Sequence, residues 1–383
     1  MTQNVFVNVT NPVALKWTGT NLYVLSGSDA TITEFCTNGT TMRTLSGLGI
    51  NPTGFDVDST GNIYVAITSS NQIWKFIPTN SCYMADTNFG NGGYIGATNG
   101  ASGSTNGQFN APFDVAISPD GGTISVSDSG NDRIQQFSTL DGSFLSEFGT
   151  NGTDVGQFNT PKGLVYDSQG DLYVVDSGND RIVFDEVPAT ISVSGSNGVA
   201  LAQFSGPLNI NISDRGVYVA DTGNNRIQSF IPGVPFDASL ANIRFAATNF
   251  SEPAAVAAVQ TLTNEMFYVA DTGNNRVLLC NVPNDNLSIV QAVWISMTTD
   301  LANGDVEALS FFSVASQSEY RQAFLSLGTS DVISGISQIG TMTTSYIDDA
   351  SAEYYFTKTV NGQLITFPVE FDLENGVWKI VEF

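Results

Sequence analysis

Short apolar runs alternate with clusters of Gly, Asn, Asp and Ser over the first 283 residues of the chain. The runs ISVSD, LYVVD, VYVAD and FYVAD each end at an Asp, and a proline 14 to 18 residues upstream opens another apolar run, at Pro112, Pro161, Pro207 and Pro253. Apolar residues at a period of two predict β-strands, and the Gly/Asn/Asp clusters predict the turns between them. The pattern therefore indicates a mainly β fold made of repeated hairpins.

The end of each run carries a six-residue motif, Asp-(Ser/Thr)-Gly-Asn-(Asp/Asn)-Arg. It occurs four times, at residues 128–133, 176–181, 221–226 and 271–276, with spacings of 48, 45 and 50 residues. A strand-rich repeat with a period in the forties is typical of a β-propeller.

Two further repeats lie upstream, where the strands persist and the motif has diverged. Pro12 leads to LYVLSGSDATI and Pro52 leads to IYVAITSSNQI. The chain thus contains six units of about 47 residues, and the fourth unit predicts four strands, at residues 163–167, 171–175, 181–186 and 190–195. The last unit lacks an outer strand, so we predict that residues 5–9 complete the sixth blade and close the ring, which removes an exposed sheet edge.

These repeats resemble the NHL repeat family. The resemblance depends on G-Q-F-N-x-P at residues 107–112 and 156–161, on Y-V-x-D, and on D-x-G-N-x-R-I. It covers residues 1–283 and implies a six-bladed β-propeller domain.

The repeated Asp and Arg residues allow two interpretations. A ring of carboxylates is one way to build a metal or catalytic site. The interpretation we favour is turn chemistry, in which Asp accepts backbone N–H groups, Gly and Asn tolerate positive φ, and Arg pairs with Asp and ties the hairpin to the next blade. The predicted structural residues are Asp128, Arg133, Asp176, Arg181, Asp221, Arg226, Asp271 and Arg276.

Residues 286–383 form the second predicted domain, of α+β class. Apolar residues at helical spacing predict helices between residues 290 and 327, and strands are expected at residues 340–347, 352–360, 363–371 and 377–383. Asn361-Gly362 and Asn375-Gly376 predict hairpin turns. This segment, which ends in G-V-W-K-I, resembles the NTF2-like cone fold, whose members are small enzymes or binding and dimerisation modules.

The chain carries 37 acidic and 13 basic residues, a formal net charge of −24. Binding to nucleic acid or to an anionic membrane needs a basic surface, so we expect neither. No apolar stretch is long enough to span a bilayer. A surface rich in Ser, Thr, Asn and Gly favours an extracellular or cell-surface protein whose signal peptide has been removed; the alternative is an acidic cytoplasmic protein from a salty habitat.

The chain has three cysteines and no histidine. Cys280 aligns with Phe137 and Phe230 of other units and is expected to fill the core. Cys36 and Cys82 follow the third strands of neighbouring units, where a disulfide between them is one option.

The absence of histidine excludes Ser–His and Cys–His nucleophile pairs. It also excludes the histidine chemistry of the propeller lyases that share this kind of repeat. Oxygen ligands for calcium remain available, as in lactonase-like propellers. Asp56 and Asp114 are the candidates, since we expect them at equivalent places in units 2 and 3. The competing interpretation is that both carboxylates simply line the channel.

The step between units 2 and 3 is the longest, and its excess is the Gly/Asn/Ser/Thr-rich segment 90–107. We expect this loop on the face that carries the motif turns, either as a recognition element or as a tolerated insertion. Its candidate contact residues are Gly90, Tyr94, Asn99 and Asn106.

Together these sequence features predict a non-enzymatic extracellular binding or scaffold protein without a cofactor. Its partner would be a protein, a glycan or a second copy of itself in a surface assembly. One alternative is a calcium-dependent lactonase or hydrolase with its metal in the central channel. Another makes the C-terminal cone the ligand-binding part and the propeller its carrier.

Overall fold

The chain folds into two compact units in a computed structural model, residues 1–238 with 245–283 and residues 239–244 with 284–383. Each unit is described by itself. The structure describes residues 2–80, 82–186, 190–200, 202–213, 216–230, 243–247, 249–259, 264–283, 343–347, 351–360, 363–374 and 377–382.

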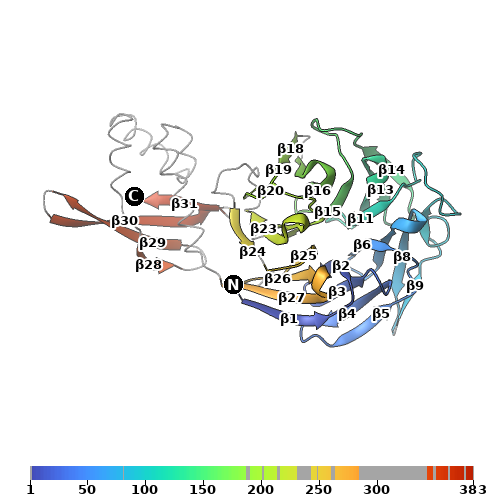
Figure 1. The fold of residues 1–383 in the computed structure, drawn as a ribbon, viewed down its shortest axis with the longest axis horizontal. Helices are drawn as coiled ribbons and strands as arrows, with labels where there is room; N and C mark the ends of the chain where they lie inside the picture. The colour runs from blue at the N-terminus through green and yellow to red at the C-terminus, as the bar shows by residue number, and fades with distance from the viewer. Residues whose placement is uncertain are drawn as a thin grey trace. The chain divides into compact units, whose positions relative to one another are not determined.

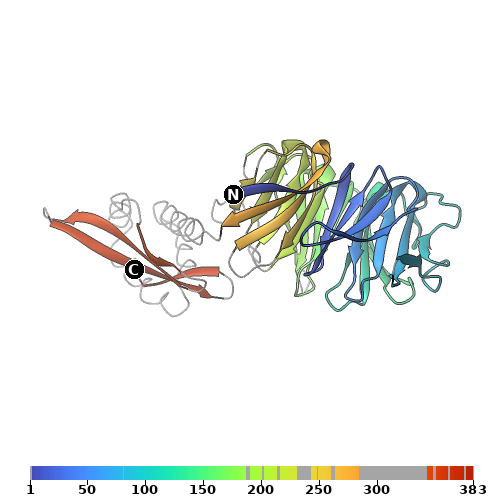
Figure 2. The ribbon, with the colours of Figure 1, turned by 90° about the horizontal axis from the view of Figure 1, so that it is seen from below.

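Six antiparallel sheets make up the first unit, a β-propeller (Figures 1 and 2). Blade 1 consists of β2 (Pro12–Trp17), β3 (Asn21–Ser26), β4 (Thr31–Cys36) and β5 (Thr41–Leu45). Blade 3 consists of β11 (Pro112–Ile117), β12 (Thr123–Asp128), β13 (Arg133–Ser138) and β14 (Phe144–Phe148). Blade 4 consists of β15 (Pro161–Tyr166), β16 (Leu172–Asp176), β17 (Arg181–Glu186) and β18 (Thr190–Ser194). Blade 5 consists of β21 (Asn209–Ser213), β22 (Gly216–Asp221), β23 (Arg226–Phe230) and β24 (Ile243–Ala247).

The sixth blade joins the two ends of the propeller sequence. It contains β25 (Pro253–Val259), β26 (Asn264–Asp271) and β27 (Arg276–Pro283), and its outer strand is β1 (Thr2–Asn8). Strand β1 runs antiparallel beside β27, with Asn4 opposite Leu279 (blue beside orange in Figure 1). The predicted closure of the ring by the N-terminal strand is therefore confirmed.

Blade 2 departs from the four-strand pattern. Its first three strands are β6 (Pro52–Val57), β7 (Ile63–Ile67) and β8 (Gln72–Pro78). Two short strands, β9 (Tyr83–Ala85) and β10 (Tyr94–Gly96), both pair with β8, so the outer strand is divided in two. The extra residues of this unit thus lie between β9 and β10, within the blade.

The core of the propeller lies between neighbouring blades. In one cluster Tyr64 and Ile73 of blade 2 pack with Ile124, Val126 and Phe137 of blade 3, all fully or almost fully buried. Burying such side chains contributes about 1.5–3 kcal/mol each. Because both faces of each sheet are covered, second strands such as LYVVD and VYVAD carry apolar residues at consecutive positions as well as at the predicted period of two.

The second unit contains a four-stranded antiparallel sheet in the order β28 (Thr343–Ile347), β29 (Ser351–Val360), β30 (Gln363–Glu374) and β31 (Val377–Glu382). These strands overlap the four predicted from the sequence. The helices predicted between residues 290 and 327 lie outside the described residues. Within the part of the chain that is described, no helix is both long and apolar enough to cross a bilayer.

Candidate functional site

The motif turns place a buried carboxylate at the end of the second strand in blades 3 to 6. Asp128, Asp176, Asp221 and Asp271 have no exposed surface. Each accepts a hydrogen bond from Nε of the motif arginine in its own blade, at 2.8, 2.7, 2.6 and 2.6 Å respectively. Each also accepts the backbone N–H of the residue two positions before the proline of its own blade, at 2.7–2.8 Å. The structure therefore brings together the eight predicted motif residues as four separate pairs.

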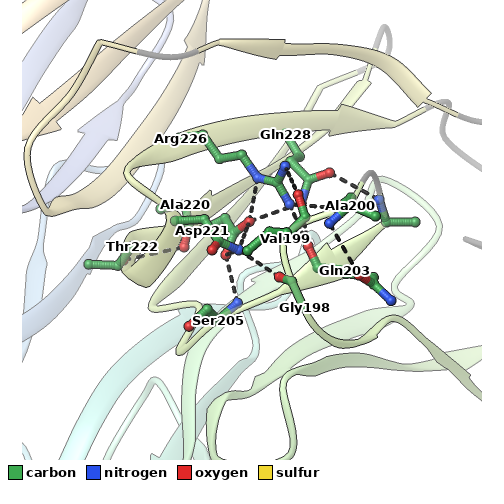
Figure 3. A network of polar contacts seen from close by, with 12 residues as sticks. Gly198, Val199, Ala200, Gln203, Ser205, Ala220, Asp221, Thr222, Arg226 and Gln228 are labelled. Atoms are coloured by element: carbon green, nitrogen blue, oxygen red, sulfur yellow. Dashed lines mark hydrogen bonds and ion pairs between the residues drawn. The ribbon is translucent and has the colours of Figure 1, made fainter.

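The motif arginines hold the segments that lead into their blades. We call these segments connectors: connector 3 is residues 97–111, connector 4 is residues 149–160 and connector 5 is residues 195–206. Arg226 donates to the carbonyls of Val199, Ala200 and Gln203 at 2.7–2.8 Å while Nε remains on Asp221 (Figure 3). Arg181 contacts three carbonyls of connector 4, and Arg133 contacts two carbonyls of connector 3 and the Glu147 carboxylate. A planar guanidinium suits this task because its donors diverge in a fixed geometry.

Each connector also contains a second repeated element, which the sequence analysis did not predict. The pattern is Gly-x4-Gln-Phe, at Gly103, Gly152 and Gly198, and its phenylalanines Phe109, Phe158 and Phe204 are buried. A Cβ on Gly152 would lie 1.9 Å from Oε1 of Gln157, so only glycine leaves room for the glutamine. That glutamine oxygen in turn accepts the N–H of Asp154. The recurring G-Q-F was visible in the sequence, but its glycine partner five residues earlier was not recognised.

Two other motif positions join each blade to the next one. In blades 3, 5 and 6 the Ser or Thr at position 2 donates to the carbonyl of the next blade's proline, as Thr222 does to Pro253 at 2.7 Å. The Asp or Asn at position 5 has positive φ and accepts the N–H of the residue before that proline, as Asp132 does from Thr160 at 2.7 Å. The same pair of contacts joins Thr272 and Asn275 of blade 6 to blade 1. The motif thus fixes a complete face of the ring, which we call the connector face.

The connectors share this framework, and their exposed tips differ in sequence from one connector to the next. The tips are residues 104–106 (Ser-Thr-Asn), residues 153–155 (Thr-Asp-Val) and residues 199–200 (Val-Ala). Val155 is 65% exposed and Val199 is 78% exposed. A repeated framework therefore presents side chains of different chemistry at equivalent places.

The predicted recognition segment 90–107 is placed differently from the expectation. Tyr94 belongs to β10 and packs on Trp74, with ring centroids 4.8 Å apart, and Gly90 donates its N–H to Asp141 of blade 3. Asn99 and Asn106 are exposed in connector 3. Residues 103–107 have counterparts in connectors 4 and 5, so the segment is not a single inserted loop: its first part is sheet, and its last part is the ordinary connector.

Asp56 and Asp114 lie on the innermost strands but not at equivalent places, which corrects the alignment made from the sequence. Asp56 lies opposite Tyr64, four residues after its proline, whereas Asp114 comes two residues after its proline, where blade 2 has Gly54. Asp56 accepts the N–H of Ile117 at 2.9 Å and pairs with Lys16 at 2.5 Å. Both carboxylates thus reach across to the next blade, since Asp114 accepts the N–H of Leu164 at 3.2 Å.

Burial changes the acidity of Asp114. Desolvation raises its pKa to about 8, although the N–H groups of Leu164 and Val115 act in the opposite direction. Its oxygens are 2.9 Å from the N of Val115 and 3.2 Å from the N of Leu164. In the described part of the chain, no group of three or more acidic or cysteine side chains is arranged to hold a metal ion.

The cysteines are free thiols in this structure, so the disulfide considered between Cys36 and Cys82 is not formed in it. Cys82 is exposed, and its sulfur lies 3.1 Å from Oγ1 of Thr79. Cys280 is fully buried opposite Phe267, and burial raises the pKa of its thiol to about 12.

Comparison with known proteins identifies an NHL-type repeat in blade 4. The NHL repeat model matches residues 158–183, which cover the end of connector 4 and most of blade 4 through its motif. The described residues form a six-bladed propeller with that repeat in its fourth blade.

Among curated proteins, NHL repeat-containing protein 3 of Mus musculus is 32% identical over 124 residues, which are 30% of this chain and 33% of that protein. The human protein of the same name is 35% identical over 79 residues, 19% of this chain and 23% of its own length. The matches therefore span a third or less of these relatives.

Among solved structures, the hydrazine synthase of Kuenenia stuttgartiensis aligns with a TM-score of 0.52 at 12% identity, over 73% of this chain and 97% of that one. Virginiamycin B lyase from Staphylococcus aureus aligns with a TM-score of 0.51 at 13% identity, over 73% of this chain and 99% of that one. At such identities these similarities establish the fold alone.

Proposed function

We propose that this chain is a non-enzymatic binding protein whose NHL-type propeller presents the connector face to another protein. The single observation that carries this proposal is the contrast between constant framework and variable tips. Every motif carboxylate and guanidinium is used within the fold, while the residues between these contacts are exposed and differ from connector to connector. In a ring of repeats, positions that differ are better suited to specific recognition than positions that recur.

The framework also gives the tips an energetic advantage in binding. Arg226 alone fixes three carbonyls of connector 5, so that connector is already ordered before a partner arrives. Ordering loops and side chains at an interface costs about 0.5–1.5 kcal/mol for each side chain that is immobilised. A preorganised face avoids much of the backbone part of that cost.

The partner we propose is a protein, because the tips expose the apolar side chains of Val155 and Val199, which association with another protein would bury. We do not propose nucleic acid or anionic lipid as a partner, because the net charge of −24 would repel both. We further propose that the protein is extracellular and that its second unit is NTF2-like and assists association.

The calcium-dependent hydrolase is less well supported by the geometry. Asp56 and Asp114 direct their oxygens to backbone N–H groups and, in Asp56, to Lys16. A calcium site would have to break these bonds, and it would have to recruit further oxygen ligands to reach six to eight.

Affinity capture from the source cells tests the proposal. Val155→Asp with Val199→Asp should abolish capture of the partner that the unchanged protein retains. The matched control is Leu140→Asp, since Leu140 is 82% exposed in the hairpin at the opposite end of β13 from the motif turn. Equal capture by both variants would reject the connector face, and loss with the control alone would move the interface to the opposite face.

A further inference from the structure

Lys162 is exceptional among the lysines of the propeller. The chain has five lysines, of which Lys16, Lys75 and Lys162 lie in the propeller. Lys16 pairs with Asp56 at 2.5 Å, and Lys75 pairs with Asp86 at 3.1 Å. Lys162 Nζ has no ion pair or hydrogen bond to any residue that the structure describes, and it lies over the ring of Phe113, 5.4 Å from its centroid.

The backbone that carries Lys162 is well fixed. Lys162 follows Pro161 directly at the start of inner strand β15, beside the connector face. The hydroxyl of Ser129 donates to the carbonyl of Pro161, and Gly163 donates its N–H to the carbonyl of Leu208 at 3.0 Å. The backbone on both sides of Lys162 is therefore bound to a neighbouring blade.

This half-buried charge is only partly compensated. Burial lowers the pKa of Lys162, because desolvation disfavours the ammonium and no nearby carboxylate opposes that effect. The ring of Phe113 offsets only part of the cost of burying this charge, because a cation over an aromatic ring gains a modest stabilisation. The ammonium keeps its N–H donors available for a further acceptor.

We propose that Lys162 and Phe113 form a binding position for the carboxylate of a small acid or peptide C-terminus with an apolar body. The ammonium would donate to the carboxylate, and the Phe113 ring would lie against the apolar part of the ligand. A singly charged group suits a single lysine, whereas a doubly charged phosphate would add repulsion in a chain of net charge −24. The assignment stands independently of the protein partner proposed above.

Nuclear magnetic resonance of the full chain after reductive ¹³C-methylation of its lysines tests this assignment. The Lys162 signal is identified by its loss in Lys162→Arg. The probes are phenylacetate, N-acetylphenylalanine and, as the uncharged control, N-acetylphenylalanine amide. We expect a saturable shift of the Lys162 signal with at least one carboxylate and none with the amide, together with a rise in the pKa of Lys162 on saturation.

The two carboxylates distinguish the sources of the ligand. Binding of N-acetylphenylalanine alone indicates a peptide C-terminus, and equal binding of phenylacetate indicates a free acid. Lys162→Met should weaken the binding measured by calorimetry about tenfold or more, because a hydrogen bond to a charged group is lost. Linear shifts of all lysine signals together, or an equal response to the amide, would overturn the assignment without the need for any variant.

Discussion

Replacing Arg226 by Met removes the centre of the contact network in blade 5. The guanidinium is buried and makes four hydrogen bonds, one to Asp221 at 2.6 Å and three to carbonyls of connector 5 (Figure 3). Removing one partner of a buried ion pair costs about 3–5 kcal/mol. Asp221 keeps the N–H of Ser205 and the amides of Asn224 and Gln228, so we expect the lower end of that range, about 3 kcal/mol.

Urea unfolding followed by circular dichroism measures the loss of stability, and hydrogen exchange with mass spectrometry shows where it acts. The amides of residues 198–204 should exchange faster in the variant, while those of connector 3 stay protected. Arg226→Lys should lose about 1–2 kcal/mol, since a lysine keeps the charge and part of the hydrogen bonding. The double variant Asp221→Asn with Arg226→Met should lose less than the sum of the single variants, because it leaves no unpaired charge. A loss under about 1 kcal/mol in Arg226→Met, the size expected of a surface pair, would refute the reasoning.

Further predictions concern backbone contacts, pH and thiols. Gly163→Ala should destabilise the propeller by about 1–3 kcal/mol, since its Cβ would lie 2.7 Å from Cα of Asn209. Gly122→Ala serves as the control in the same urea titration, because its Cβ would come no closer than 3.4 Å to the side chain of Asp120. Because burial raises the pKa of Asp114 to about 8, the folded state holds this proton more tightly than the unfolded state, so stability should fall as pH rises from about 4 to 8. Thermal melts at a series of pH values should show a shallower fall in Asp114→Asn than in the unchanged protein. The same pH dependence in both proteins would contradict the prediction. A thiol reagent should label Cys82 in the native protein and Cys280 only in urea, and native labelling of Cys280 would count against its burial.

Much of the ring could be predicted from the sequence because its determinants are local and recur. Asp, Gly and Asn at fixed places within six residues specify the turn, and the same turn recurs at nearly constant spacing. Closure by β1 followed from counting the strands of the last unit. The turns required only neighbouring residues, whereas closure required the comparison of the last unit with the other repeats.

The remainder depends on contacts between residues far apart in the chain. Residues 90–107 are predicted from the sequence as a single loop between blades, but the pairing of β10 with β8 places residues 94–96 inside blade 2. Asp56 and Asp114 were aligned by residue type, although they lie at different distances from their prolines. The lack of an ion pair at Lys162 among the described residues depends on which side chains lie near its ammonium in the fold. No local sequence pattern encodes those neighbours. The motif indicated no separate role for position 5, yet the side chains at that position accept backbone N–H groups at the start of the next blade.

Photo-crosslinking from the connector face tests the central claim most directly. A benzoylphenylalanine at position 155, in place of Val155, should give a discrete covalent adduct with one protein in source-cell extract. The same group in place of Leu140, which is even more exposed and lies on the opposite face, should give none. The same adducts from both positions, or an adduct from position 140 alone, would contradict recognition through the variable tips of the connectors.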